Sequence, residues 1–123
     1  MICLKNIDEI NDKYGRSVGN TLILKVVNVL KDIMSSDTMH IRYSGVRILS
    51  ICSNTDADSV HNVVERVLNS IKNEAVYINE ERVSVDVQIL IHTFKKQNNL
   101  EKEVQKMVSY IDGMRDTNTI KII

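Results

Sequence analysis

The chain lacks proline, an excess of charge of either sign and any long apolar run, and these absences exclude several classes of protein. The 16 basic residues balance the 16 acidic ones, whereas a surface that binds the phosphates of DNA or RNA normally shows net positive charge. We therefore expect no nucleic-acid partner. No apolar run approaches the roughly 18 residues that span a membrane, and no signal peptide is visible. We expect a cytoplasmic domain without membrane insertion, although its parent protein could be anchored elsewhere.

Cysteine and histidine are too scarce and too scattered to indicate a disulfide or a metal centre. Cys3 and Cys52 lie in apolar, strand-like runs, which favours two reduced thiols. His40, His61 and His92 fall in separate predicted elements, with no cysteine or carboxylate grouped beside them. No Ser/His/Asp order and no pair of catalytic carboxylates is recognisable. We therefore predict neither a histidine metal site nor a catalytic residue.

The length of the chain and its lack of linker segments indicate one domain. A chain of 123 residues can bury one ordinary core, and it contains no repeat and no glycine- or serine-rich linker. Its first and last residues both read as strands, which is unusual for a complete protein. We therefore expect residues 1–123 to be a single domain excised from a longer multidomain protein.

The periodicity of apolar residues predicts strands interleaved with amphipathic helices. We expect strands at residues 1–4, 41–43, 47–52, 76–78, 83–91 and 120–123. We expect helices at residues 18–34, 56–72 and 100–114, and a brief helix capped by Asn6. The apolar residues of 83–91 alternate with mostly polar ones, which predicts one buried face and one mostly wet face. The fold class is α+β: a central, mixed, mostly antiparallel sheet of about five to six strands flanked by helices, with a split βαβ plan.

Three short stretches carry a family resemblance. Residues 10–20 read Ile-Asn-Asp-Lys-Tyr-Gly-Arg-Ser-Val-Gly-Asn, residues 42–48 read Arg-Tyr-Ser-Gly-Val-Arg-Ile, and residues 116–120 read Asp-Thr-Asn-Thr-Ile. In this order, between these elements, they resemble the motifs of the GGDEF domain of diguanylate cyclases. Those enzymes join two GTP molecules into cyclic di-GMP. The resemblance covers nearly the whole chain. We expect this chain to be a degenerate member of that family.

The resemblance implies that the metal ligands of the family are missing. In active members an aspartate on the first strand and an acidic residue of the hairpin bind Mg²⁺. Cys3 and Val46 stand at those positions, and neither a thiol nor an isopropyl group is the hard oxygen ligand that magnesium requires. The next hairpin position, normally glutamate, is Arg47. We therefore expect no cofactor and no bound magnesium.

The resemblance also implies that most phosphate contacts are lost. The family's late lysine and arginine, which contact phosphate, align with Gly113 and Thr117. In the hairpin, Ser44 replaces the first glycine and only Gly45 is unchanged. Arg47 could pair with a nucleotide phosphate in place of the metal, or it could be an ordinary solvated arginine. Ser44, Gly45 and Arg47 remain candidate nucleotide-binding residues.

Guanine recognition is better preserved than phosphate recognition. Asn11 matches the family's asparagine, whereas Asn20 replaces an aspartate and so loses a charge-assisted hydrogen bond to guanine. Both asparagines could be remnants of a guanine site, or they could be turn residues. The Arg-x-x-Asp site that binds inhibitory cyclic di-GMP in the family aligns with Ser35 and Thr38, so that site is predicted to be absent.

These observations lead to three hypotheses of function. The first is a catalytically inactive, degenerate GGDEF-like domain with a regulatory, dimerisation or protein-interaction role in bacterial cyclic di-GMP signalling. The alternative is a sensor that binds GTP or another nucleotide and regulates a neighbouring domain. Residual nucleotide hydrolysis or cyclase activity ranks third, because no residue supplies its base or metal. The expected partners are a second copy of the chain, a neighbouring signalling domain or a nucleotide.

Overall fold

The computed structural model describes residues 1–123, which form seven strands and four helices. The strands are β1 Ile2–Leu4, β2 Met39–Ser44, β3 Arg47–Ile51, β4 Val76–Ile78, β5 Glu81–Val83, β6 Val87–Ile91 and β7 Thr119–Ile122. The helices are α1 Ile7–Tyr14, α2 Arg16–Ile33, α3 Ala57–Asn73 and α4 Leu100–Asp112. No helix is both long enough and apolar enough to cross a membrane.

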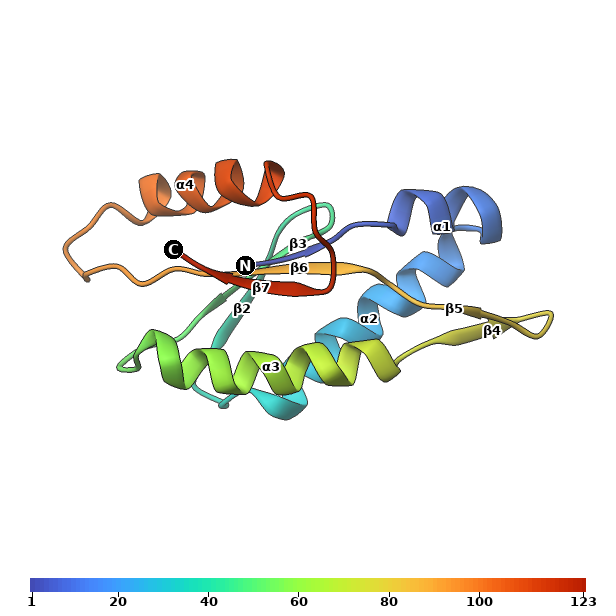
Figure 1. Ribbon diagram of the computed structural model, residues 1–123, viewed down its shortest axis with the longest axis horizontal. Helices are drawn as coiled ribbons and strands as arrows, with labels where there is room; N and C mark the ends of the chain where they lie inside the picture. Colours follow the sequence, from blue (N-terminus) through green and yellow to red (C-terminus); the bar gives the residue numbers. More distant parts are fainter.

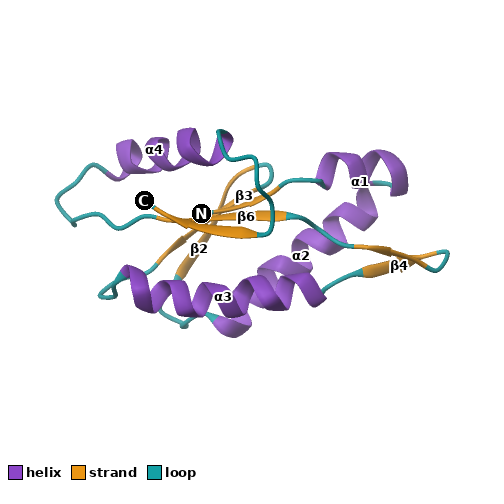
Figure 2. Ribbon diagram, in the orientation of Figure 1, coloured by secondary structure: helices purple, strands orange, loops and turns teal.

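A five-stranded sheet in the order β2-β3-β1-β6-β7 forms the centre of the domain. All neighbouring strands are antiparallel except β6 and β7, which are parallel. Strands β4 and β5 make a separate hairpin that projects from one end (Figure 1). Helices α2 and α3 cover one face of the sheet, and α4 lies over the other (Figure 2). The predicted α+β class, with its mostly antiparallel sheet, is confirmed.

The core is divided by the sheet into two layers, because successive side chains of a strand point to opposite faces. In β1, Ile2 and Leu4 belong to the larger cluster under α2 and α3. Cys3 belongs to the smaller cluster under α4, which also includes Leu49 and Leu90. All three residues of β1 are buried, so the central strand is covered on both faces. Cys3 and Cys52 are both free thiols.

The prediction that residues 83–91 have one wet face is wrong. All five residues of β6 are buried, because α4 covers the face that the sequence pattern assigns to water. Gln88 lies on that covered face and is fully buried. Its Nε2 donates hydrogen bonds of 2.9 Å to the carbonyls of Met114 and Asp116, in the segment after α4. The polar side chain therefore fixes the end of α4 to the sheet.

Residues 83–91 are also not one strand, and Asn6 is the physical reason. The Asn6 Nδ2 donates to the Ser84 carbonyl at 3.0 Å, and its Oδ1 accepts from the Asp86 N–H at 2.8 Å. These bonds replace strand pairing and separate β5 from β6. The prediction that Asn6 stands at the N-cap of the first helix is confirmed in position, but its side chain makes no capping hydrogen bond because it is used by Ser84 and Asp86.

A carboxylate lies beside His92, contrary to the expectation from the sequence. His92 Nε2 is 2.6 Å from Oε2 of Glu103, a buried residue on α4. Asn98 and Lys106 donate to the other carboxylate oxygen at 3.1 and 3.4 Å. These hydrogen bonds, that of His92 first, hold the pKa of Glu103 below its ordinary value. The cluster joins α4 to the end of β6.

We expect Glu103 to make the stability of the domain depend on pH in the acid range. Its folded pKa is depressed, so its stabilisation is present above the unfolded value of about 4.5 and is lost as the pH falls through the lower folded pKa. Glu103→Gln should lower the melting temperature at pH 7 and flatten its decline between pH 5 and 3. Glu101→Gln, on the exposed first turn of the same helix, is the control. Parallel acid slopes for Glu103→Gln and the original chain would contradict this account.

Candidate functional site

The predicted site residues come together at the end of the sheet where β1 leads into α1. The backbone N–H of Leu4 donates to the Val46 carbonyl at 2.9 Å, and Cys3 is paired in register with Arg47. The hairpin between β2 and β3 therefore lies against the carboxyl end of β1 (Figure 1). Helices α1 and α2 follow β1 directly and carry Asn11 and Asn20.

The side chain of Asn11 packs against α2 at Gly19, where any larger residue would collide with it. A Cβ atom added to Gly19 would lie 1.8 Å from Asn11 Oδ1, so the missing side chain makes the room. The same Oδ1 is buried and has no hydrogen-bond partner. Buried polar atoms are normally satisfied, so Asn11 Oδ1, packed against Gly19, is an acceptor whose hydrogen-bonding capacity is unused within the chain.

The requirement for Gly19 is a feature that the sequence analysis missed. A glycine inside a helix costs about 1 kcal/mol relative to alanine, and Gly19 lies within the first turns of α2. The presence of a glycine in the helix despite that cost is the sequence signal that a neighbouring group needs the space. Asn20 differs from Asn11, because it is exposed and makes no side-chain hydrogen bond within the chain.

Arg47 is engaged in an ion pair, which neither sequence-based reading of it anticipated. Its Nη2 donates to Oδ1 of Asp112, the last residue of α4, and its Nη1 donates to Ser44 Oγ at 3.3 Å. The hydrogen bond to Asp112 raises the pKa of Arg47 further above its ordinary value. The guanidinium thus ties α4 to the hairpin. Any phosphate that bound Arg47 would have to compete with a carboxylate.

The hairpin itself is a tight turn closed by a neighbouring arginine. Gly45 has a φ of 48°, in the left-handed region where glycine is favoured. Arg42 Nε donates to the Gly45 carbonyl at 2.9 Å. Ser44 and Gly45 are both exposed, so the backbone of this turn is accessible from solvent.

Cys3 and Val46 present no oxygen ligand at the junction of β1 and the hairpin. Cys3 is buried among the apolar residues under α4, and burial raises the pKa of its thiol. A thiol that stays protonated is a poor metal ligand. Val46 is half-buried and packs against both core clusters.

The remaining positions singled out in the sequence have structural roles. Gly113 caps the end of α4, and Thr117 is exposed in the following loop. Ser35 Oγ accepts from the Asp37 N–H at 3.2 Å in the turn after α2, and Thr38 Oγ1 lies 3.9 Å from Cys52 Sγ. These contacts belong to a helix end, turns and strand ends.

Asn118, within the motif at residues 116–120, has a structural role. It adopts a φ of 55°. Its Oδ1 accepts from the Val87 N–H at 3.2 Å, and its Nδ2 donates to Asp86 Oδ1 at 3.1 Å. Its own N–H donates to the Val87 carbonyl at 2.6 Å. Asn118 therefore sets the start of the parallel pairing of β6 with β7.

A family profile and several proteins of known structure match this chain. The profile described as "Diguanylate cyclase, GGDEF domain" matches residues 1–116. Diguanylate cyclase A of Treponema denticola is 23% identical over 94 residues, which are 76% of this chain and 25% of that protein. The chain therefore spans a quarter of the length of that relative.

The solved structures agree in fold. The GGDEF domain of DgcB from Caulobacter crescentus, solved in complex with c-di-GMP, superposes with a TM-score of 0.82 at 16% identity, over 98% of this chain and 74% of that one. The diguanylate cyclase SiaD from Pseudomonas aeruginosa, in complex with its activator SiaC, gives a TM-score of 0.76 at 17% identity. That match covers 99% of this chain and 47% of SiaD.

We expect the contact between Gly19 and Asn11 to reverse the usual effect of replacing a helical glycine by alanine. In the original chain, Gly19→Ala should lower the free energy of unfolding by about 1–2 kcal/mol, because the new methyl group displaces the Asn11 amide. In an Asn11→Ala background the same change should raise it by about 0.5–1 kcal/mol, the ordinary helix-propensity gain. Urea titrations of the four proteins measure this.

Gly113→Ala is the matched control for that cycle. A Cβ atom there would meet the Tyr110 carbonyl at 3.5 Å, an ordinary contact, so the change should be close to neutral in both backgrounds. An equal effect of Gly19→Ala with and without the Asn11 side chain would show that the contact does not govern this region.

Proposed function

The chain belongs to the GGDEF family of diguanylate cyclase domains, and from that premise we propose that it is a regulatory member that does not itself form cyclic di-GMP. Its role is contact with a second copy, a partner protein or a neighbouring domain in cyclic di-GMP signalling. SiaD, of similar fold, was solved in complex with an activator protein, which is consistent with such a role.

The chemistry of Cys3 and Val46 carries this proposal. Phosphoryl transfer depends on stabilising charge at the transferred group, which metal ions supply in enzymes of this kind. Magnesium binds oxygen ligands in near-octahedral geometry. A buried thiol whose pKa is raised and a valine side chain do not fit that ion. Arg47, at the next position, adds a positive charge where a further carboxylate stands in active members.

The ion pair of Arg47 with Asp112 supports the same proposal. A cation at this end of the sheet could in principle replace the metal's charge, but Asp112 already neutralises it. The positions of the other two phosphate contacts hold Gly113 and Thr117, which have no charge. Arg42 is the cationic side chain of the hairpin without an anionic partner, and its Nε is used by the Gly45 carbonyl within the turn.

A cyclase assay tests this proposal. The protein is incubated with GTP and Mg²⁺ or Mn²⁺, and the products are separated by chromatography, with SiaD and its activator as the positive control. We expect no cyclic di-GMP. The triple variant Cys3→Asp, Val46→Glu, Arg47→Glu restores oxygen ligands, and it should gain Mg²⁺-dependent binding of GTP even if it remains inactive. Formation of cyclic di-GMP by the original chain would refute the proposal.

A second candidate function, nucleotide sensing without metal, is favoured by one observation. Asn11 Oδ1 is a buried acceptor without a partner, held in place by the room at Gly19. The N1–H and amino groups of guanine are donors that would satisfy an amide carbonyl. We propose that, if a nucleotide binds, its base is recognised at Asn11 while its phosphates compete with Asp112 for Arg47.

We expect calorimetric titrations with GTP, ATP and cyclic di-GMP, without metal, to separate these two parts of the site. Asn11→Ala should weaken GTP binding about tenfold, because a hydrogen-bonded base loses its partner. Asp112→Asn should strengthen it about tenfold, because the guanidinium is released from its anionic partner. Asn62→Ala, at an exposed position of α3, is the control. The absence of any nucleotide binding to folded protein would leave the protein-contact role alone.

A further inference from the structure

Strand β2 forms one edge of the central sheet and is its longest strand. It has six residues, and it pairs with β3 on one side and with no strand on the other. Five of the six residues are exposed. An edge strand presents a row of unpaired backbone N–H and C=O groups, which natural proteins usually protect from other strands. The free side of β2 is therefore a template for pairing with another chain.

The register of the sheet determines which backbone groups of β2 point away from β3. The Val46 carbonyl accepts a hydrogen bond from β1, so every second residue after Val46 also turns toward β1. The β3 residues between them turn toward β2, and one of these, Leu49, is paired with Ile41. Ile41 therefore forms hydrogen bonds within the sheet. Its neighbours His40 and Arg42 direct their N–H and C=O groups outward.

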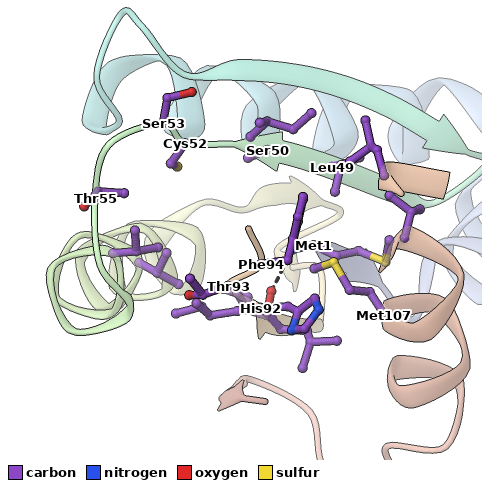
Figure 3. A pocket seen from close by; sticks show the side chains of 18 of the residues that line it. Met1, Leu49, Ser50, Cys52, Ser53, Thr55, His92, Thr93, Phe94 and Met107 are labelled. Atoms are coloured by element: carbon purple, nitrogen blue, oxygen red, sulfur yellow. Dashed lines mark hydrogen bonds between the residues drawn. The ribbon is translucent and has the colours of Figure 1, made fainter. Parts of the chain in front are cut away.

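The same strand exposes apolar side chains on one face of the sheet. Met39 is opposite Ile51 and Ile41 is opposite Leu49, and directly opposite residues share a face. In Figure 3, Leu49 lies on the same side of the view as Met107 of α4, and both belong to the cluster under that helix. Met39 and Ile41 lie outside that cluster and are 59% and 39% exposed. An apolar strip therefore continues from under α4 to the free edge.

The usual protections of an edge strand are weak in β2. The strand contains no proline and no lysine. Its one irregularity of pairing falls between Arg42 and Ser44, at the hairpin end, so the residues before it stay in regular register. The Arg42 guanidinium is turned back toward the hairpin, because its Nε donates to the Gly45 carbonyl at 2.9 Å. His40 is half-buried, and its Nδ1 lies 2.7 Å from Ser50 Oγ on β3.

His40 does not make this edge repel a positive charge at neutral pH. Burial, and to a smaller extent the nearby Lys31, lowers the pKa of the His40 imidazole below its ordinary value. Like charges directly opposite each other destabilise a pair of strands. A neutral imidazole therefore tolerates an arginine of another chain in the opposite position.

The free edge of β2 is complementary to itself. Two copies that run antiparallel about a two-fold axis at Ile41 place His40 of each copy opposite Arg42 of the other. Both residues direct their backbone groups outward, so each of the two pairs exchanges two hydrogen bonds. An axis at Arg42 would put two arginines opposite each other. An axis at His40 would pair Arg42 with Thr38, whose N–H is already bonded to a turn carbonyl.

We propose that β2 is a dimerisation edge, on which a second copy of this chain pairs through its own β2 about a two-fold axis at Ile41. The two sheets become one continuous sheet, and Met39 and Ile41 of both copies lie side by side on its α4 face. Such an interface uses the same surface of both subunits, so it closes at two copies and covers both edges. The proposal rests on the proposed contact with a second copy, but not on the absence of cyclase activity, which a separate assay measures.

Cysteine cross-linking tests the register. The two Ile41 residues would form a non-hydrogen-bonded pair with Cα atoms about 4.5 Å apart, within the range of a disulfide. Under mild oxidation, Ile41→Cys should form at least about tenfold more covalent dimer than Met39→Cys, whose two copies would lie more than about 10 Å apart along the strands. The original chain, with free Cys3 and Cys52, gives the background. Equal cross-linking of the two variants would overturn the proposal.

Analytical ultracentrifugation without cross-linking is the second measurement. The apolar strip is short, so the protein is used at up to about 1 mM. We expect the original chain to dimerise and Ile41→Lys to stay monomeric, because two lysines would meet at the axis. Tyr77→Lys is the matched control, because it removes a side chain that is 68% exposed on β4, outside the central sheet. It should dimerise like the original chain.

Two outcomes of this measurement would contradict the proposal. A monomeric original chain would leave the edge of β2 to a strand of a different protein. An Ile41→Lys variant that still dimerises would show that another surface, such as the opposite edge at β7, joins the copies. Circular dichroism checks that the lysine variants are folded, and the cross-linking comparison does not depend on them.

Discussion

The pairing of β1 with both β3 and β6 is the constraint on which the rest of the domain depends. Only three residues long, β1 joins the two halves of the sheet, and its side chains enter both layers of the core. The carboxyl end of β1 positions the hairpin through the hydrogen bond between Leu4 and Val46.

Under the proposal of an inactive domain, the hairpin region keeps the shape of a binding site without its metal ligands. Gly45 still makes the tight turn, and Gly19 still leaves room for Asn11. The hairpin is also joined to α4 by the ion pair between Arg47 and Asp112. That contact connects the end of α4 to the sheet.

Much of the fold could be predicted from the sequence, because helical and strand periodicities differ clearly in chains of this composition. The errors arose where a polar side chain acts across the fold. Asn6 reads as a helix cap, but it bonds to Ser84 and Asp86, some 80 positions away. Gln88 reads as solvent-facing, but its Nε2 donates to carbonyl groups after α4. The pairs of His92 with Glu103 and of Arg47 with Asp112 were missed for the same reason. No local pattern marks a partner that tertiary packing supplies.

The position of β1 in the sheet has a consequence for synthesis on the ribosome. Ile2 pairs with Ile89, and at about 5–20 residues per second the ribosome needs roughly 4–17 s to make the intervening chain. During that interval β3 can form a hairpin with β2, but β1 has a partner on one side only. The nascent chain therefore exposes an unpaired, apolar strand edge until β6 has been made. Chaperones that hold such edges would act on this domain chiefly before β6 emerges.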